Sequence, residues 1–188
     1  MKLILTRHGE TIGNIKKIAE GHLHGKLSKL GKNQAKKVAL RLKNEKIDYI
    51  YSSDLDRAKD TAKEIAKYHP NISIKSDKKL REIDVGDFTW MADKDIDWDN
   101  PPKNFETNIK AQKRIKKFLD KIYSKYKNKT VLFVGHSFIN KALITAIHHE
   151  SADCMKKYKQ SNTAINIFEI KEDKKHKVHL LNCVKHLE

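Results

Sequence analysis

The chain has 188 residues, a length that suits one globular domain and leaves little room for a second. Its composition is 38% hydrophobic and 34% charged, with periodic apolar blocks and no apolar stretch that could span a bilayer or form a signal peptide. This excludes disorder and predicts a cytoplasmic protein with no membrane partner. The formal net charge of +16 comes from lysines spread along nearly every predicted helix, which favours a solvated basic surface that attracts anionic substrates over a specific nucleic-acid partner.

Short apolar runs alternate with longer amphipathic stretches, a pattern typical of a βαβ sheet covered by helices. In chain order, strands are predicted at 2–6, 49–51, 72–74, 130–134, 164–170 and 177–184, and helices at 28–44, 58–69, 105–126 and 137–149. The run from Thr130 to Val134 is almost entirely apolar, which predicts a central strand buried on both faces. We therefore predict an α/β fold, a three-layer α/β/α sandwich with a mostly parallel central sheet, in a single domain over residues 1–188.

Residues 85–104 break this pattern. The stretch is rich in turn residues and contains Trp90, Met91, Trp98 and the pair Pro101-Pro102. Long irregular segments inside compact domains are often functional, so we predict a small lid or insertion here. Its alternating aspartates lack the glycine turn and the final glutamate of a calcium loop, which favours a solvated acidic loop.

Two histidines directly follow predicted strands. Arg7-His8-Gly9-Glu10-Thr11 comes after the first strand, and Gly135-His136 comes after the strand at 130–134. A neutral imidazole can attack phosphorus while an adjacent guanidinium holds the phosphoryl oxygens, so this pair indicates phosphoryl transfer. We expect Gly9 to let the backbone turn tightly beside a bound phosphate. Asn14, on the same loop, offers a side-chain amide to a phosphoryl oxygen.

Three further segments reach the same edge of the predicted sheet. Arg57 lies near the N-terminus of the helix at 58–69, where backbone amides also favour anions. His136-Ser137 repeats this arrangement at the next helix, and the Ser137 amide is a candidate donor. Leu80-Arg81-Glu82-Ile83 adds a carboxyl group. Arg81 could join the phosphate site or anchor the loop that carries Glu82, and the sequence leaves both open.

Taken in order, these motifs resemble the histidine phosphatase superfamily, in the branch that contains cofactor-dependent phosphoglycerate mutases and broad-specificity and α-ribazole phosphatases. The resemblance runs from Leu3 to about Glu169 and implies the phosphoglycerate mutase-like fold. It implies that His8 is the nucleophile and Glu82 the general acid. The phosphate-binding groups that it implies are Arg7, Arg57 and His136, and we expect His136 to be protonated so that it adds positive charge. It also implies that no metal or other cofactor is needed.

The chain departs from the family pattern at Glu20–Ser28 and at Trp90-Met91-Ala92, which flank the expected pocket entrance and bear on substrate preference. We predict a phosphomonoester hydrolase that acts on a small phosphorylated metabolite through a phosphohistidine. The alternative is a cofactor-dependent phosphoglycerate mutase, disfavoured because an arginine-rich substrate loop is missing. An inactive binding protein and a basic nucleic-acid binder are weaker alternatives. The natural substrate and the oligomeric state are left open.

Other candidate groups favour structural interpretations. Cys154 and Cys183 fall in no Cys-x-x-Cys arrangement, so the sequence indicates neither a disulfide framework nor a zinc site. The histidines near the motifs show no three-ligand spacing and are expected on the surface: His22, His24, His148 and His149.

Overall fold

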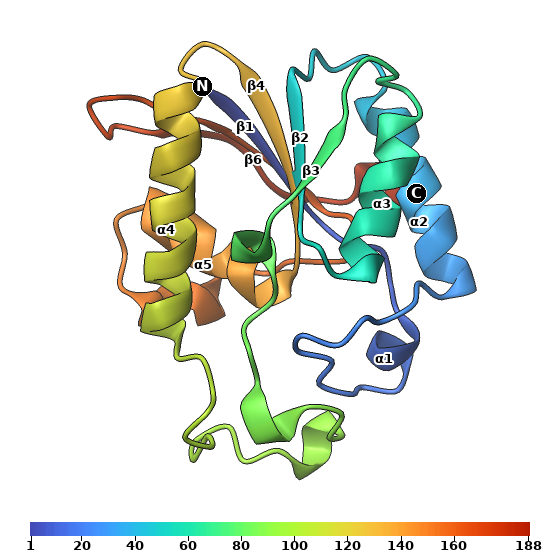
Figure 1. Ribbon diagram of the computed structural model, residues 1–188, viewed down its shortest axis with the longest axis vertical. Coiled ribbons are helices and arrows are strands. Elements are labelled where there is room, and N and C mark those ends of the chain that lie inside the picture. Colours follow the sequence, from blue (N-terminus) through green and yellow to red (C-terminus); the bar gives the residue numbers. More distant parts are fainter.

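The computed structural model describes residues 1–188 and contains one six-stranded sheet in the order β3-β2-β4-β1-β5-β6 (Figure 1). The strands are β1 (Lys2–Arg7), β2 (Tyr49–Ser52), β3 (Ile74–Ser76), β4 (Thr130–Gly135), β5 (Ile165–Glu169) and β6 (Lys177–Cys183). The helices are α1 (Ile12–Ile15), α2 (Lys29–Leu42), α3 (Asp56–Ala66), α4 (Asn108–Lys125) and α5 (Ser137–Ile147). The first four strands in the sheet order run parallel to one another, whereas β5 pairs antiparallel with both of its neighbours, β1 and β6. The predicted mostly parallel α/β sandwich is confirmed.

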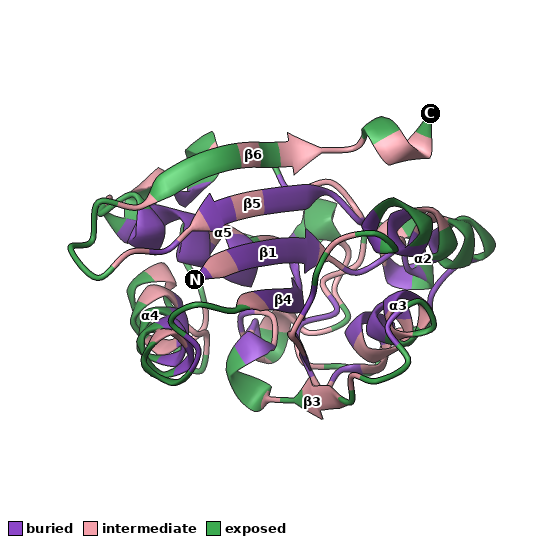
Figure 2. Ribbon diagram, turned by 90° about the horizontal axis from the view of Figure 1, so that it is seen from above, coloured by how far each residue is buried: buried purple, intermediate pink, exposed green.

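Helices cover both faces of the sheet. Figure 2 shows α2 and α3 packed on one side and α4 and α5 on the other. The apolar side chains accordingly form two separate clusters, one that joins the sheet to α4 and α5 and one that joins it to α2 and α3. β4 lies inside the sheet and is buried from Val131 to Gly135, as its continuous apolar run predicted. None of the helices is both long and apolar enough to cross a membrane.

Several predicted boundaries are shifted: α3, predicted at 58–69, spans Asp56–Ala66, and α5 ends at Ile147. Two further shifts have clear local reasons. The third strand begins at Ile74, because Ile72 still belongs to the turn in which its amide donates to the carbonyl of His69. Helix α4 begins at Asn108, capped by Thr107, whose hydroxyl accepts from the amide of Lys110. Apolar spacing alone extended this helix back to residue 105, which instead packs among aromatic rings outside it.

The segment from residue 85 to residue 104 contains two short 3₁₀ turns, Gly86–Phe88 and Asp93–Asp95. Trp98 packs edge-to-face against Phe88 and against Phe105. The backbone of Ala19 exchanges hydrogen bonds with this segment, since its amide donates to Met91 and its carbonyl accepts from Trp90. These contacts place the segment beside the loop that follows β1.

Candidate active site

The two site histidines meet because β1 and β4 are parallel neighbours in register. Arg7 pairs with Gly135, so the next residues, His8 and His136, leave the same edge of the sheet side by side. Their ring centroids are 5.0 Å apart. Arg57, in the first turn of α3, joins them through a hydrogen bond to His136. The structure thus brings together three of the residues that the sequence placed at this edge.

His8 is buried and held in one tautomer. Its Nδ1 lies 2.7 Å from the carbonyl oxygen of Gly9, and because that oxygen can only accept, Nδ1 carries the proton. Burial and the guanidinium charges of Arg57 and Arg7 lower the pKa of His8 well below its usual 6.5. The ring is therefore neutral near pH 7, and its Nε2 lone pair is available for attack.

His136 is also neutral, which corrects the expectation of a protonated ring. Its Nδ1 accepts a hydrogen bond of 3.1 Å from Nε of Arg57, a group that can only donate. Burial, followed by the charge of Arg57, lowers the pKa of His136 well below 6.5. The single ring proton therefore sits on Nε2, which is buried without a partner. His136 offers a neutral N–H donor, and the positive charge of the site comes from the arginines.

Hydrogen bonds to two backbone carbonyls and to His136 hold the guanidinium of Arg57 in place, and some of its N–H groups remain unused. Its Nη1 and Nη2 donate to the carbonyl oxygens of Leu23 (2.6 Å) and Gly21 (2.8 Å), and the carboxylate of Glu20 lies 3.9 Å from Nε. With the bond to His136, three of its five N–H groups are used. The two remaining N–H groups can donate to phosphoryl oxygens without any change in the orientation of the guanidinium.

Arg7 and Asn14 form the opposite wall. The Nη1 of Arg7 donates to the carbonyl of Gln160 (2.9 Å), whereas its Nε is buried without a partner. The Oδ1 of Asn14 accepts from Arg7 Nη2 (3.4 Å) and from Asn162 Nδ2 (3.2 Å). Because its oxygen is engaged in this way, the side-chain amide of Asn14 keeps N–H groups that could donate to a ligand.

The carboxylate of Glu82 binds the N-terminus of α5. Its two oxygens accept from the backbone amides of Phe138 (3.1 Å) and Ile139 (3.0 Å). An anion at this helix end is favoured by the dipole. Of the first three amides of α5, only that of Ser137 is left for substrate. Glu82 therefore occupies most of the anion site that the sequence predicted at this helix.

Two neighbours hold the backbone of Glu82 from outside the pocket. Its carbonyl accepts from Nε2 of His22 (2.8 Å) and from Arg114 (3.4 Å), which also forms a two-point ion pair with Glu106. His22 is thus part of the site's support, although 31% of its side chain remains exposed at the surface. The sequence signal for this contact was weak, since a lone histidine in a glycine-rich loop has no distinguishing spacing.

Arg81 anchors the loop and does not line the pocket. It makes a two-point ion pair with Asp54, with Nε–Oδ1 at 2.7 Å and Nη2–Oδ2 at 2.6 Å. Asp54 lies just before the start of α3, so this pair ties the loop of Glu82 to the helix that carries Arg57. Of the two roles that the sequence left open for Arg81, the structure therefore supports the anchoring of the loop that carries Glu82.

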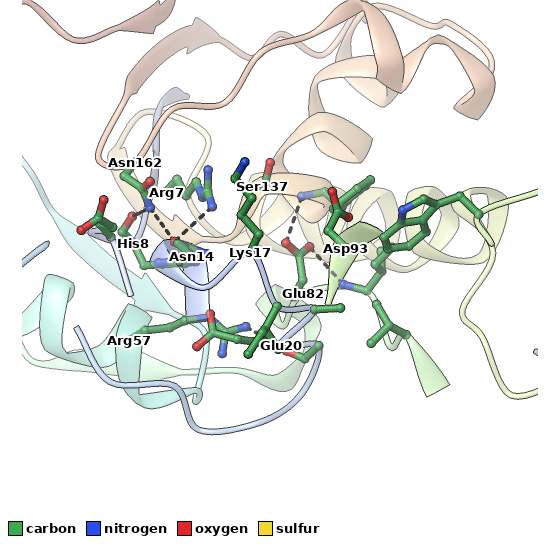
Figure 3. A pocket seen from close by; sticks show the side chains of 18 residues that line it. Arg7, His8, Asn14, Lys17, Glu20, Arg57, Glu82, Asp93, Ser137 and Asn162 are labelled. Carbon is green, nitrogen blue, oxygen red and sulfur yellow. Dashed lines mark hydrogen bonds and ion pairs between the residues drawn. The ribbon is translucent and has the colours of Figure 1, made fainter. Parts of the chain in front are cut away.

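Arg7, His8, Arg57 and Glu82 are among the residues that line a cavity of about 450 Å³, shown in Figure 3. All seven predicted site residues lie in it or beside it: Arg7, His8, Asn14, Arg57, Glu82, His136 and Ser137. Sequence reasoning missed several others that line it, among them Lys17, Asp93, Phe138 and Asn162. These come from loops and from a helix end, where no hydrophobic periodicity marks which side chain faces inward.

A family model described as histidine phosphatase superfamily (branch 1) matches residues 3–183 of this chain. The chain belongs to the histidine phosphatase superfamily. Among its relatives, the phosphoglycerate mutase-like protein 4 of Arabidopsis thaliana is 30% identical over 204 residues, covering all of this chain and 87% of the relative. The phosphoserine phosphatase 1 of Hydrogenobacter thermophilus is 32% identical over 162 residues, covering 78% of this chain and 76% of the relative.

A solved structure agrees with this membership. A mutant of the phosphoserine phosphatase of Entamoeba histolytica, in complex with phosphoserine, superimposes with a TM-score of 0.89 at 26% identity. The match covers all of this histidine phosphatase chain and 99% of the other. The family match and these phosphatase neighbours support a phosphatase.

Proposed function

We propose that this histidine phosphatase hydrolyses phosphomonoesters of a small metabolite through a phosphohistidine at Nε2 of His8. The observation that carries the proposal is the fixed tautomer of His8, whose Nδ1–H is bound to Gly9 so that a neutral Nε2 faces the cavity. Around it, Arg7 Nε and His136 Nε2 are buried donors without partners. Buried donors of this kind cost free energy unless a ligand satisfies them, and phosphoryl oxygens suit both.

The first step transfers the phosphoryl group to the enzyme. Nε2 of His8 bonds to phosphorus as the bond from phosphorus to the ester oxygen breaks, and Arg7 and Arg57 stabilise the charge on the equatorial oxygens. Protonated Glu82 gives its proton to the departing alkoxide, which leaves as an alcohol. The two guanidinium groups supply the positive charge, so the reaction as proposed needs no metal ion and no cofactor.

The second step releases phosphate. The carboxylate of Glu82 takes a proton from water as the water oxygen bonds to phosphorus and the bond to Nε2 breaks. His8 is again neutral and inorganic phosphate leaves with the added oxygen. Glu82 ends the cycle protonated, ready for the next substrate. Because its carboxylate is held by α5, it acts from one fixed position in both steps.

The test is hydrolysis of a phosphomonoester panel in the presence of a chelator by the wild type, by His8→Ala and by His24→Ala. His24 is an exposed histidine on a nearby loop and serves as the matched control. The panel includes O-phosphoserine, because relatives are phosphoserine phosphatases, and 3-phosphoglycerate with its 2,3-bisphosphorylated primer. We expect phosphate release that disappears only in His8→Ala.

Other outcomes separate the alternatives. A base-stable, acid-labile ³²P label on the quenched wild type but not on His8→Ala would identify the phosphohistidine. Isomerisation of phosphoglycerate without net phosphate release would make the protein a mutase. Turnover that survives in His8→Ala, or that stops on addition of chelator, would contradict the proposed mechanism. Nucleic-acid binding that persists in His8→Ala, without turnover of any ester, would favour a basic binding protein.

A further inference from the structure

A second cavity, of about 560 Å³, adjoins the phosphate cavity and takes no part in the chemistry proposed above. It is lined by ten residues: Ile83, Asp93, Trp98, Pro101, Phe105, Thr107, Asn108, Ile109, Phe138 and Asp153. Four of them also line the phosphate cavity: Ile83, Asp93, Trp98 and Phe138. The two cavities are therefore adjacent, with these four residues between or beside them.

Glu82 stands at this boundary. Ile83, the next residue in the chain, and Phe138, whose amide holds the carboxylate, each line both cavities. In the proposed mechanism the acid must touch the ester oxygen that leaves, so the carbon skeleton attached to that oxygen begins where the cavities meet. The geometry directs the leaving group toward the second cavity and away from the arginines.

The walls of this second cavity are largely aromatic and aliphatic. The rings of Trp98 and Phe138 lie 6.4 Å apart between centroids at an angle of 29°, and 40% and 36% of these residues remain exposed. Edge-to-face packing against Phe88 and Phe105 fixes the indole of Trp98. A rigid apolar surface of this kind gains free energy by burying a flat ring.

The charge of the lining disfavours a second anionic group. Among the ten lining residues the only charged ones are Asp93 and Asp153, although the chain has 40 lysines and arginines. The ammonium of Lys141 lies against the Phe138 ring, 5.0 Å from its centroid, and lines a further cavity instead. A carboxylate or second phosphate placed among these rings would face two exposed carboxylates and no lining cation, so its charge would be repelled.

We propose that the second cavity is a leaving-group subsite for an aromatic group that carries no second negative charge. The inference rests on the proposed phosphatase function and names the substrate class of that same site. Such a substrate preference would differ from that of an enzyme that acts on small phosphate esters with a second negative charge. A cavity of this size exceeds what the leaving group of such an ester fills.

The test compares two primary alkyl esters, 2-(1-naphthyl)ethyl phosphate and ethyl phosphate, whose leaving alcohols have similar basicity. In the wild type we expect kcat/KM to be at least about tenfold higher for the naphthyl ester, because its ring buries apolar surface in the subsite. In Trp98→Ala this ratio should fall toward one. The control is Trp90→Ala, an exposed tryptophan of the same segment that lines neither cavity and should keep the wild-type ratio.

A second comparison needs no variant. 2-(4-Carboxyphenyl)ethyl phosphate should have a lower kcat/KM than 2-phenylethyl phosphate in the wild type, since its carboxylate meets Asp93 or Asp153. Hydrolysis of the naphthyl and ethyl esters at equal efficiency would overturn the subsite and leave the phosphatase function standing. A wild-type ratio that Trp98→Ala does not change would also overturn it. Absence of hydrolysis of every ester would overturn both proposals.

Discussion

The side-chain oxygens of Glu82 accept hydrogen bonds from backbone amides, and in the proposed mechanism its protonated carboxyl group delivers the proton to the leaving oxygen. Replacement by glutamine removes that proton. We expect Glu82→Gln to lower kcat by about 10²–10⁴-fold for alkyl phosphates. The loss should be far smaller for p-nitrophenyl phosphate, whose leaving group departs without protonation. Steady-state kinetics with both substrates check this difference.

The control for Glu82→Gln is a measurement of the variant's stability. A glutamine side chain presents an N–H group to the amides of α5, which leaves one amide unsatisfied and lowers the free energy of unfolding by about 1–3 kcal/mol. Urea denaturation measures this loss. Equal loss of activity toward both substrates would indicate a positioning role for Glu82 rather than proton transfer.

The two site histidines make stability depend on pH. Their pKa values lie well below the 6.5 of an exposed histidine, because burial and the charge of Arg57 disfavour the protonated rings. Below pH 6.5 the unfolded chain therefore binds protons that the folded chain does not. The free energy of unfolding should fall as pH decreases from there, by up to about 1.4 kcal/mol per pH unit for each ring. In His8→Gln the slope between pH 6.5 and 5.5 should be shallower, and an unchanged slope in urea denaturation would contradict this account.

At the scale of elements, the N-terminus of α2 packs directly on the loop that carries His8. A Cβ on Gly31 would overlap the carbonyl of Glu10, and a Cβ on Gly9 would overlap the carbonyl of Gly31. The φ angle of Gly9 is not positive, so this glycine is required for close approach and not for the tight turn that the sequence suggested. Ser28 caps the same helix and also donates to Glu10.

We therefore expect Gly31→Ala to destabilise the protein, although alanine is the better helix former. The backbone has to shift, which should lower the free energy of unfolding by about 1–3 kcal/mol and displace His8 enough to reduce kcat. The matched control is Lys32→Ala, at the next and exposed position of α2, which should change stability by no more than about 0.5 kcal/mol. If the two variants were equally stable, the packing of α2 on the loop would not constrain the site.

At the scale of the whole molecule, the sheet and the edge that bears the site could be predicted because each motif follows an apolar run. Parallel strands then place the motifs together regardless of the loops between them. The neutral state of His136 could not be predicted, since it depends on which atom of Arg57 faces Nδ1. The use of the α5 amides by Glu82 escaped prediction for a similar reason, as it joins residues 56 and 57 positions apart in the chain.

The net charge of +16 should affect how fast an anionic ester reaches the pocket. Positive charge over the surface steers a phosphate dianion toward Arg7 and Arg57, and salt screens this attraction over about 10 Å at 0.1 M. We expect kcat/KM to fall as ionic strength rises from about 0.02 to about 0.5 M, by about tenfold, while kcat changes little. Stopped-flow and steady-state kinetics across a salt series measure both quantities.

A variant with fewer surface charges separates steering from local effects of salt. Lys113, Lys117 and Lys121 are exposed on one face of α4 and lie outside both cavities, so replacing all three with glutamine leaves the site intact. The salt dependence of kcat/KM should become shallower in this variant, with the difference disappearing at high ionic strength, because only the long-range field has changed. The same slope in both proteins would mean that salt acts on the arginines of the pocket directly and that the basic surface does not guide the substrate.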